Sequence, residues 1–194
     1  MKDFLFRGDL SAIDPAVYEL TQLEAERQVR KLIMIPSESQ APLAVRDALA
    51  SAFQNIYAEG YPREETRWLS EAEIVDYPAR LVHFRRYADR RYYKGVEYAD
   101  VAEELARRRC AELFANEKVS ADDIYVNVQP LSGAPANNAV YHALVQPGET
   151  IMGMDLLHGG HLTHGSPVNR SGKFYNAVHY SVDPQTEQIN YDAV

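Results

Sequence analysis

The stretch IYVNVQPLSGAPANNAVYHALVQPGETIMGM, residues 124–154, decides the fold class. Residues 124–128 are rich in β-branched and aromatic side chains, residues 135–145 have a helical pattern, and residues 150–154 are again strand-like. A strand, a short helix and a second strand are typical of a βαβ unit, in which the two strands are parallel. Residues 176–182 predict a further strand. The sequence therefore predicts an α/β fold built on a parallel sheet.

Helices are predicted before this unit. Asp14, followed by a proline at the first helical position, predicts the start of a helix that continues through residues 16–32. A second helix is predicted over residues 42–53, and a third over residues 96–114, where apolar positions recur at helical spacing.

The chain divides into three predicted parts. Residues 1–62 form an N-terminal helical arm. Residues 63–90 are dense in charges of both signs and carry the only tryptophan, which predicts a charged helical insert on the surface. Residues 91–194 form the first part of a large α/β domain, which we expect to continue because the chain stops shortly after a turn signal at Asp183.

The composition excludes several classes of partner. The net charge is −8 and no basic stripe stands out, so nucleic acid is not expected as a partner. No apolar run reaches the length of a membrane span, so we expect no membrane association. The single cysteine, Cys110, allows no disulfide within the chain, which fits a cytoplasmic protein.

A turn of small residues leads into the helix of the βαβ unit. It reads QPLSGAPAN, residues 129–137, with Ser132 and Gly133 just before the first helical turn. A helix N-terminus offers free backbone N–H groups and the positive end of the helix dipole, which suit a phosphate. The alternative is a plain N-cap without a ligand.

The loop after the next strand holds three histidines, His158, His161 and His164, among glycines. Ligands of open α/β sheets bind beyond the carboxyl ends of strands, where this loop and the small-residue turn both fall. Three readings are open. The histidines could bind zinc, although no cysteine is near; they could simply be hydrogen-bonded within the loop; or one imidazole could lie flat on an aromatic ligand. The metal reading is the weakest, and no metal is expected.

Polar residues elsewhere are further candidates. Ser37 follows a proline break, and Glu59 lies between two small residues in a tyrosine-rich loop. A partly desolvated Glu59 carboxyl would favour acid–base use, whereas a loop glutamate in solvent is the reading that the sequence alone favours. Tyr92 and Tyr93 could pack as aromatic rings or act as hydroxyl donors.

Taken together, five ordered blocks resemble the serine hydroxymethyltransferase (glycine hydroxymethyltransferase) family. They are IPSES (35–39), YAEGYP (57–62), RYYKGVEYAD (91–100), VQPLSGAPAN (128–137) and MDLLHGGHLTHGSPVNRSGKFYN (154–176). The resemblance implies a fold-type-I pyridoxal-phosphate-dependent transferase that moves a one-carbon unit reversibly between serine and tetrahydrofolate, giving glycine. It also implies a homodimer with active sites shared between subunits, and makes residues 91–194 the first part of the large cofactor-binding domain.

The resemblance assigns roles toward the cofactor. Ser132 and Gly133 match the phosphate-binding turn, and His161 matches the histidine that stacks on the pyridine ring. Tyr57 matches the tyrosine that reaches the cofactor phosphate of the partner subunit.

The other matches concern the substrates. Glu59 matches the acid–base glutamate beside the substrate hydroxyl and the folate, and Ser37 matches the serine near the substrate carboxylate. The remaining matched positions are the tyrosine pair Tyr92 and Tyr93, at the substrate and folate sites, and Leu156 and Gly160, whose backbone holds the pterin. Among all matched residues, those expected to be catalytic are Glu59, His161 and Tyr92.

The chain departs from the family pattern in three respects. Ala134 removes a hydroxyl from the phosphate turn, and residues 63–90 separate two blocks that the family joins with a couple of residues. The cofactor lysine of the family lies in a Thr-rich block ending in His-Lys, which none of the five lysines matches, so this stretch alone is expected to be inactive. Two alternatives stay open: a folate-independent aldolase acting on β-hydroxy amino acids, and a non-catalytic dimerising paralogue.

Overall fold

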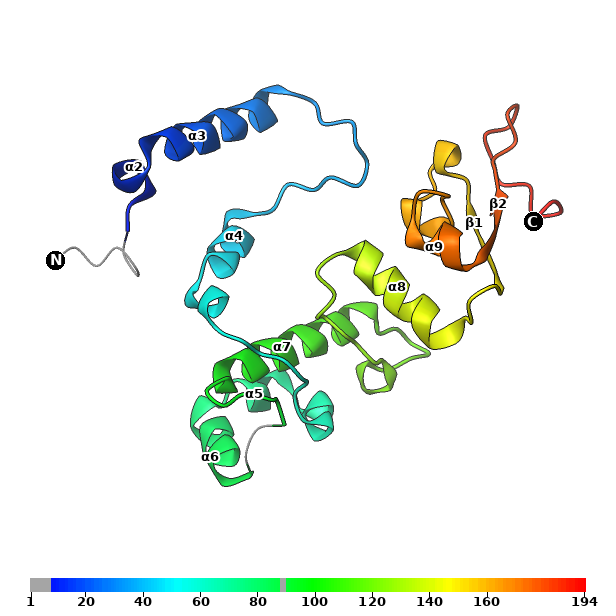
Figure 1. The fold of residues 1–194 in the computed structure, drawn as a ribbon. Coiled ribbons are helices and arrows are strands. Elements are labelled where there is room, and N and C mark those ends of the chain that lie inside the picture. The colour runs from blue at the N-terminus through cyan, green and yellow to red at the C-terminus, as the bar shows by residue number, and fades with distance from the viewer. Residues whose placement is uncertain (1–7, 88–89) are drawn as a thin grey trace. The chain divides into compact units, whose positions relative to one another are not determined.

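The computed structural model describes residues 8–87 and 90–194, in two compact units that divide between Ile56 and Tyr57. Figure 1 shows helices in both units and the strands β1 and β2 in the second. The division precedes residue 62, the predicted end of the arm, because residues 57–62 pack with the second unit. Within the described ranges, no helix combines the length and apolar character needed to cross a bilayer.

The first unit consists of helices joined by extended chain. They are α2 (Leu10–Ile13), α3 (Pro15–Arg30), α4 (Leu43–Leu49) and the 3-10 turn η1 (Ala52–Asn55). The Asp14 carboxylate accepts a hydrogen bond from the Val17 N–H at 3.1 Å, which confirms the predicted start of α3. No described side chain of this unit is buried, so its apolar residues lack a core within the unit.

In the second unit, residues 63–87 pack against a long helix (Figure 1). The segment holds η2 (Glu64–Trp68), α5 (Glu71–Ile74) and α6 (Tyr77–Tyr87), and the helix is α7 (Glu97–Phe114). Ile74, Phe84 and Val101 form a buried cluster between these helices. The described part of the segment is largely helical, as predicted. Most of its described side chains are at least partly exposed, while its apolar residues Ile74 and Phe84 are buried in the cluster with Val101 of α7.

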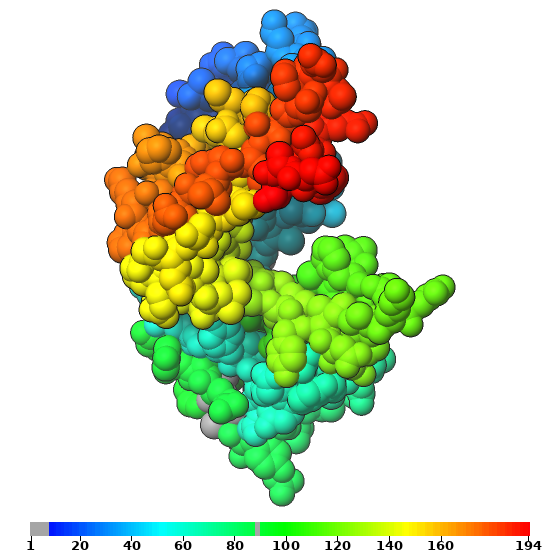
Figure 2. All heavy atoms as spheres, turned by 90° about the vertical axis from the view of Figure 1, so that its right-hand side faces the viewer, coloured from blue at the N-terminus to red at the C-terminus, as the bar shows by residue number. Residues whose placement is uncertain are grey.

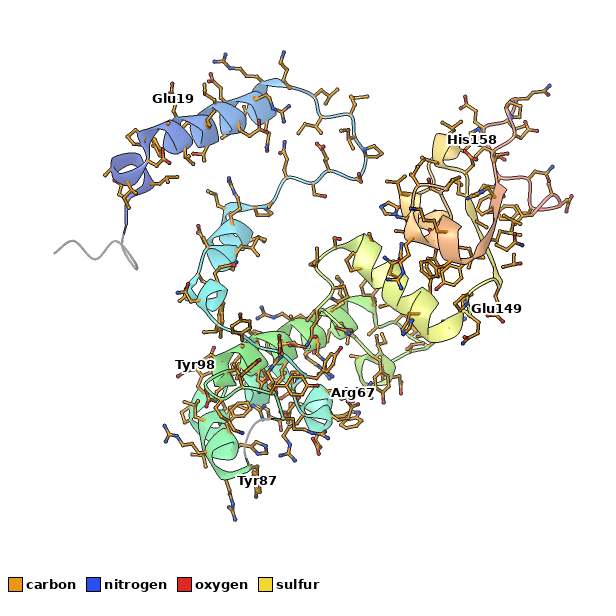
Figure 3. All side chains as sticks on the ribbon, viewed as in Figure 1. Glu19, Arg67, Tyr87, Tyr98, Glu149 and His158 are labelled. Atoms are coloured by element: carbon orange, nitrogen blue, oxygen red, sulfur yellow. The ribbon has the colours of Figure 1, made fainter. Side chains whose placement is uncertain are left out.

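The predicted strand at residues 124–128 does not form. The segment follows η3 (Ala121–Asp123) in an extended conformation, and Arg67 holds it (Figure 3). The Arg67 guanidinium lies 3.4 Å from the centroid of the Tyr125 ring and donates to the Asp122 carbonyl at 2.9 Å. A strand requires a neighbour for its ladder of hydrogen bonds, and the two described strands pair with each other instead.

The sheet of the described chain consists of two parallel strands. After helix α8 (Gly133–Leu144) come β1 (Thr150–Met154) and β2 (Asn176–Tyr180), with Thr150 opposite Asn176. The crossover between the strands contains η4 (Leu156–His158), η5 (Leu162–His164) and α9 (Arg170–Phe174). Parallel strands joined by a helical crossover confirm the α/β character. The βαβ unit, however, joins β1 to β2 rather than residues 124–128 to β1.

Candidate functional site

The N-terminus of α8 is open. Ser132 is its N-cap in extended conformation, and the serine side chain makes no capping hydrogen bond. A Cβ placed on Gly133 meets no heavy atom within 4 Å. The first N–H groups of a helix have no partner inside the helix, so Gly133 and Ala134 present backbone donors here. This turn therefore has both the donors and the room for an anion.

Thr163 ties α8 to the loop after β1. Its side chain is fully buried. The Asn137 side-chain amide donates to the Thr163 hydroxyl at 2.7 Å, and the Tyr141 hydroxyl donates to the Thr163 carbonyl at 3.0 Å. In Figure 2 the yellow spheres of α8 and the orange spheres of the loop form one continuous surface. The loop and the helix N-terminus thus belong to one packed body.

The same threonine orients the His161 ring. Its N–H donates to His161 Nδ1 at 3.2 Å, and its hydroxyl lies 2.7 Å from the same nitrogen. Because the hydroxyl already accepts from Asn137, its proton is available for Nδ1. Nδ1 is then the acceptor, and the proton of the neutral ring is assigned to Nε2. The imidazole is held at one edge, and its orientation relative to α8 is set.

The three histidines of the loop have different contacts. His164 Nδ1 accepts from the His161 N–H at 3.0 Å, and the His164 carbonyl lies 2.9 Å from Nε2 of His179. His158, labelled in Figure 3, lies at the exposed end of η4. Across residues 8–87 and 90–194, histidine, cysteine and acidic side chains form no group of three that could hold a metal ion. The spacing of the histidines therefore does not make them equivalent.

Two glycines let this loop pack closely. Gly165 has φ +100°, and a Cβ there would lie 2.3 Å from the Cβ of Ala177. A Cβ on Gly160 would lie 2.0 Å from the Met154 carbonyl oxygen. The Gly160 N–H donates to the carbonyl of Asp155, the residue after β1, at 2.9 Å. The side chain of Leu156, the next residue, is about half exposed. The loop thus folds back onto the end of β1.

A second cluster brings together four other predicted residues. The rings of Tyr57 and Tyr93 lie 5.6 Å apart between centroids, at an interplanar angle of 42°. The Tyr92 N–H donates to the Glu59 carbonyl at 3.1 Å. The Glu59 side chain is exposed among the described residues, so in this single chain it is a loop glutamate in solvent rather than a partly desolvated one. Tyr92 is also exposed, at 80%.

Arg91 organises this cluster, and the sequence analysis missed it. The guanidinium is buried and donates to the carbonyls of Ala58 and Gly60, on either side of Glu59, at 2.5 and 3.0 Å. It also pairs with Asp100, and with Glu103 at 2.5 Å, on α7. Burial opposes the charge, but the hydrogen bonds that Arg91 donates to the carboxylates of Glu103 and Asp100, together with their charges, outweigh it and raise the pKa of Arg91.

The sequence contains a pattern from which the buried contacts of Arg91 could have been predicted. Arg91 opens the RYYKGVEYAD block, and two acids follow it three residues apart on a predicted helix, which is the spacing that puts them on one face. Gln129, just before the small-residue turn, adds a link: its amide donates to the Gly60 carbonyl at 2.8 Å and to Glu103 at 2.9 Å.

Ser37 lies in the first unit. It is exposed in a turn closed by a hydrogen bond from the Glu38 N–H to the Ile35 carbonyl at 3.1 Å. The residues predicted for the site are therefore found in three places: the α8 and histidine-loop body, the Arg91 cluster and this turn.

Comparison with known proteins gives a consistent match. The family model of serine hydroxymethyltransferase matches residues 10–88 and 82–194. A serine hydroxymethyltransferase of Leifsonia xyli subsp. xyli (strain CTCB07) is 46% identical over 189 residues, which cover 97% of this chain. The aligned part is 36% of that relative, so the chain spans about a third of its length.

Proposed function

The chain belongs to the serine hydroxymethyltransferase family, and from this premise we propose that it is the part of a fold-type-I enzyme that binds pyridoxal phosphate and transfers a one-carbon unit between serine and tetrahydrofolate. The observation that carries the proposal is the hydrogen-bonded series from Asn137 through Thr163 to His161. It fixes an imidazole relative to an open helix N-terminus, which is what a planar ligand with a phosphate requires.

The residues present fit pyridoxal phosphate. The Ser132 hydroxyl and the backbone N–H groups of Gly133 and Ala134 would hold the phosphate, with the open space over Gly133 as room for it. The His161 ring would lie against the pyridine ring, its edge held by Thr163. When bound, the cofactor supplies the electron sink for charge that develops on the substrate. Ala134 supplies no hydroxyl, so the backbone carries more of this contact.

The second cluster would serve the substrates. We assign to Glu59 the exchange of a proton with the substrate hydroxyl, and to Tyr92 and Tyr93 contacts with the substrate and the folate. Arg91 holds the backbone on both sides of Glu59, so the carboxylate is exposed but its attachment is rigid. Ser37 would bind the substrate carboxylate. The backbone of Leu156 and Gly160 is assigned to the pterin.

A homodimer is part of the proposal. The exposed apolar side chains of α3 include Val17, Leu20 and Val29, at 44%, 63% and 87% exposure, and the unit has no buried residue among those described. Such a surface is typical of a protein interface. Burial in a dimer would also cover the exposed Glu59, and we assign Tyr57 to the cofactor phosphate of the partner subunit.

A folate-independent aldolase is the second candidate. It is favoured by one observation: residues 63–90 bring side chains to the rim of the pocket beside Tyr92. The residues that line this pocket are Gly60, Tyr61, Pro62, Glu64, Arg90 and Tyr92. An altered rim at this place would change the affinity for the folate before it changed the chemistry on the amino acid.

The experiment is a glycine-formation assay on the natural full-length protein. With bound pyridoxal phosphate and serine, we expect glycine to form only when tetrahydrofolate is added. Equal rates without folate, with cleavage of other β-hydroxy amino acids, would support the aldolase. Failure to bind pyridoxal phosphate would leave the non-catalytic paralogue.

A further inference from the structure

We propose that residues 63–87, docked on α7, form a brace that limits the motion of the Glu59 loop and the Tyr92–Tyr93 pair, and that Arg80 is a positioning residue in this brace. Arg80 touches neither substrate nor cofactor in the proposed function. It acts through Glu104 and α7. The effect on kinetics rests on the proposed function, whereas the structural effect does not.

The brace begins with a row of acids on α7. Asp100 and Glu103 accept hydrogen bonds from the guanidinium of Arg91. The next residue, Glu104, accepts from Arg80 Nη2 with both carboxylate oxygens, at 2.6 and 2.7 Å. The side chains of Arg80 and Glu104 are 8% and 1% exposed. One face of the helix therefore anchors both the inserted segment and the arginine that holds the candidate site.

The Arg80–Glu104 contact is a buried ion pair. Burial raises the pKa of Glu104, while the charge of Arg80 and hydrogen bonds from Thr66 and Arg80 work against this rise. Removing one partner of such a pair leaves an uncompensated buried charge. The apolar cluster of Ile74 and Phe84 lies on the same segment. Loss of Arg80 is therefore expected to release the segment from α7.

Release would reach the site because both ends of the segment lie there. Its first residue follows closely after Gly60, whose carbonyl accepts a hydrogen bond from Arg91, and Arg91 itself comes shortly after its last residue. The contact between the Tyr92 N–H and the Glu59 carbonyl, at 3.1 Å, lies between these ends. Docking of the segment on α7 thus limits the motion of both Glu59 and Tyr92, the two residues that make this contact.

A matched control exists between α7 and another helix of the same segment. Arg109 on α7 pairs with Glu71 on α5, but these side chains are 59% and 43% exposed. Exposed pairs contribute little to stability because water screens them. Arg109→Gln removes a cross-segment ion pair without leaving a buried charge, so it separates loss of an ion pair from loss of the brace.

The test is amide hydrogen exchange on the natural full-length protein. We expect the Tyr92 amide to exchange at least about tenfold faster in Arg80→Met and to stay unchanged in Arg109→Gln. Faster exchange in α6 with an unchanged Tyr92 amide overturns the proposal.

If Arg80→Met does not fold, Arg80→Met with Glu104→Leu removes both charges and keeps apolar volume. In that double variant α6 and Tyr92 should be protected together, and protection of α6 alone also overturns the proposal.

Kinetics give an independent readout. In Arg80→Met we expect the KM for tetrahydrofolate to rise at least about fivefold, while the Kd for pyridoxal phosphate stays within about twofold, because the residues assigned to the cofactor, apart from Tyr57, lie on α8 and the histidine loop. Equal losses in both constants would mean general damage to the fold and would overturn the positioning role. If the wild-type protein shows no folate-dependent activity, the proposed function fails, and the exchange experiment still decides the brace.

Discussion

The side-chain amide of Asn137 donates to the hydroxyl of Thr163 over 2.7 Å, and this contact joins helix α8 to the loop that carries His161. The two residues come from opposite sides of strand β1 in the sequence. Their contact makes the helix N-terminus and the imidazole parts of one packed body, although neither is a strong signal of function when taken alone.

Replacement of Asn137 by alanine should weaken binding of pyridoxal phosphate. It leaves the buried Thr163 hydroxyl without its donor and so weakens one of the two contacts that Thr163 makes with the His161 ring. Loss of one such hydrogen bond costs about 1 kcal/mol, which corresponds to a rise of about fivefold in Kd. Fluorescence titration of the full-length protein with the cofactor measures this. The control is Asn138→Ala, on the next position of the same helix, and equal effects of the two variants would contradict the role of Asn137.

Replacement of Gly165 by alanine should destabilise the protein strongly. The new Cβ would meet the Ala177 Cβ at 2.3 Å, at a φ of +100°. Gly148 has φ +90° but no atom within 4 Å of an added Cβ, so Gly148→Ala measures only the cost of holding alanine in a left-handed backbone conformation. We expect about 1 kcal/mol for Gly148→Ala and at least about 2 kcal/mol for Gly165→Ala in denaturant unfolding. Equal losses would mean that close packing against β2 is unimportant.

Replacement of Glu59 by glutamine should lower turnover far more than cofactor affinity. The amide keeps the shape of the side chain but cannot carry the proton that we assign to it. General acid–base catalysis typically contributes at least about 100-fold, so kcat should fall by about that factor, with the Kd for pyridoxal phosphate nearly constant. Glu117→Gln, at an exposed position after α7, is the control. An unchanged kcat in Glu59→Gln rejects the assignment.

The free energy of unfolding should decrease as the solution is made more acidic, because the pKa of His83 is lowered in the folded protein. Burial first, and then the charges of Arg80 and Arg63, lower the pKa of His83 below 6.5, although Glu65 opposes them. The unfolded chain therefore binds a proton that the folded one resists, so the free energy of unfolding decreases as the pH falls from 6.5 toward the lowered value.

The change is measured by urea unfolding at about pH 7.5 and about pH 5.5. His83→Gln should show a smaller loss between the two conditions than the wild-type protein. His142→Gln, at an exposed position on α8, should behave like the wild type. A loss of the same size in His83→Gln would contradict the burial argument.

Local signals predicted most of the helices. Asp14 before a proline is an N-cap whatever surrounds it, and α3 begins there. The apolar spacing of residues 96–114 likewise predicted α7, which begins one residue later. Residues 124–128 have the composition of a strand but no strand pairs with them, because ladder partners come from elsewhere in the chain.

The sequence by itself determined the family, the α/β class, the helix starts and the residue types that we propose for the site. Only the tertiary structure decided which of these residues lie together. Three histidines at equal spacing become unequal because Asn137, far away in the sequence, donates to Thr163, which holds the ring of His161. Arg91 and Arg80 are ordinary charges in the sequence, and each becomes structural because α7 offers it a buried carboxylate. Capping and periodicity depend on neighbours in the chain, whereas buried pairing depends on contacts that only folding creates.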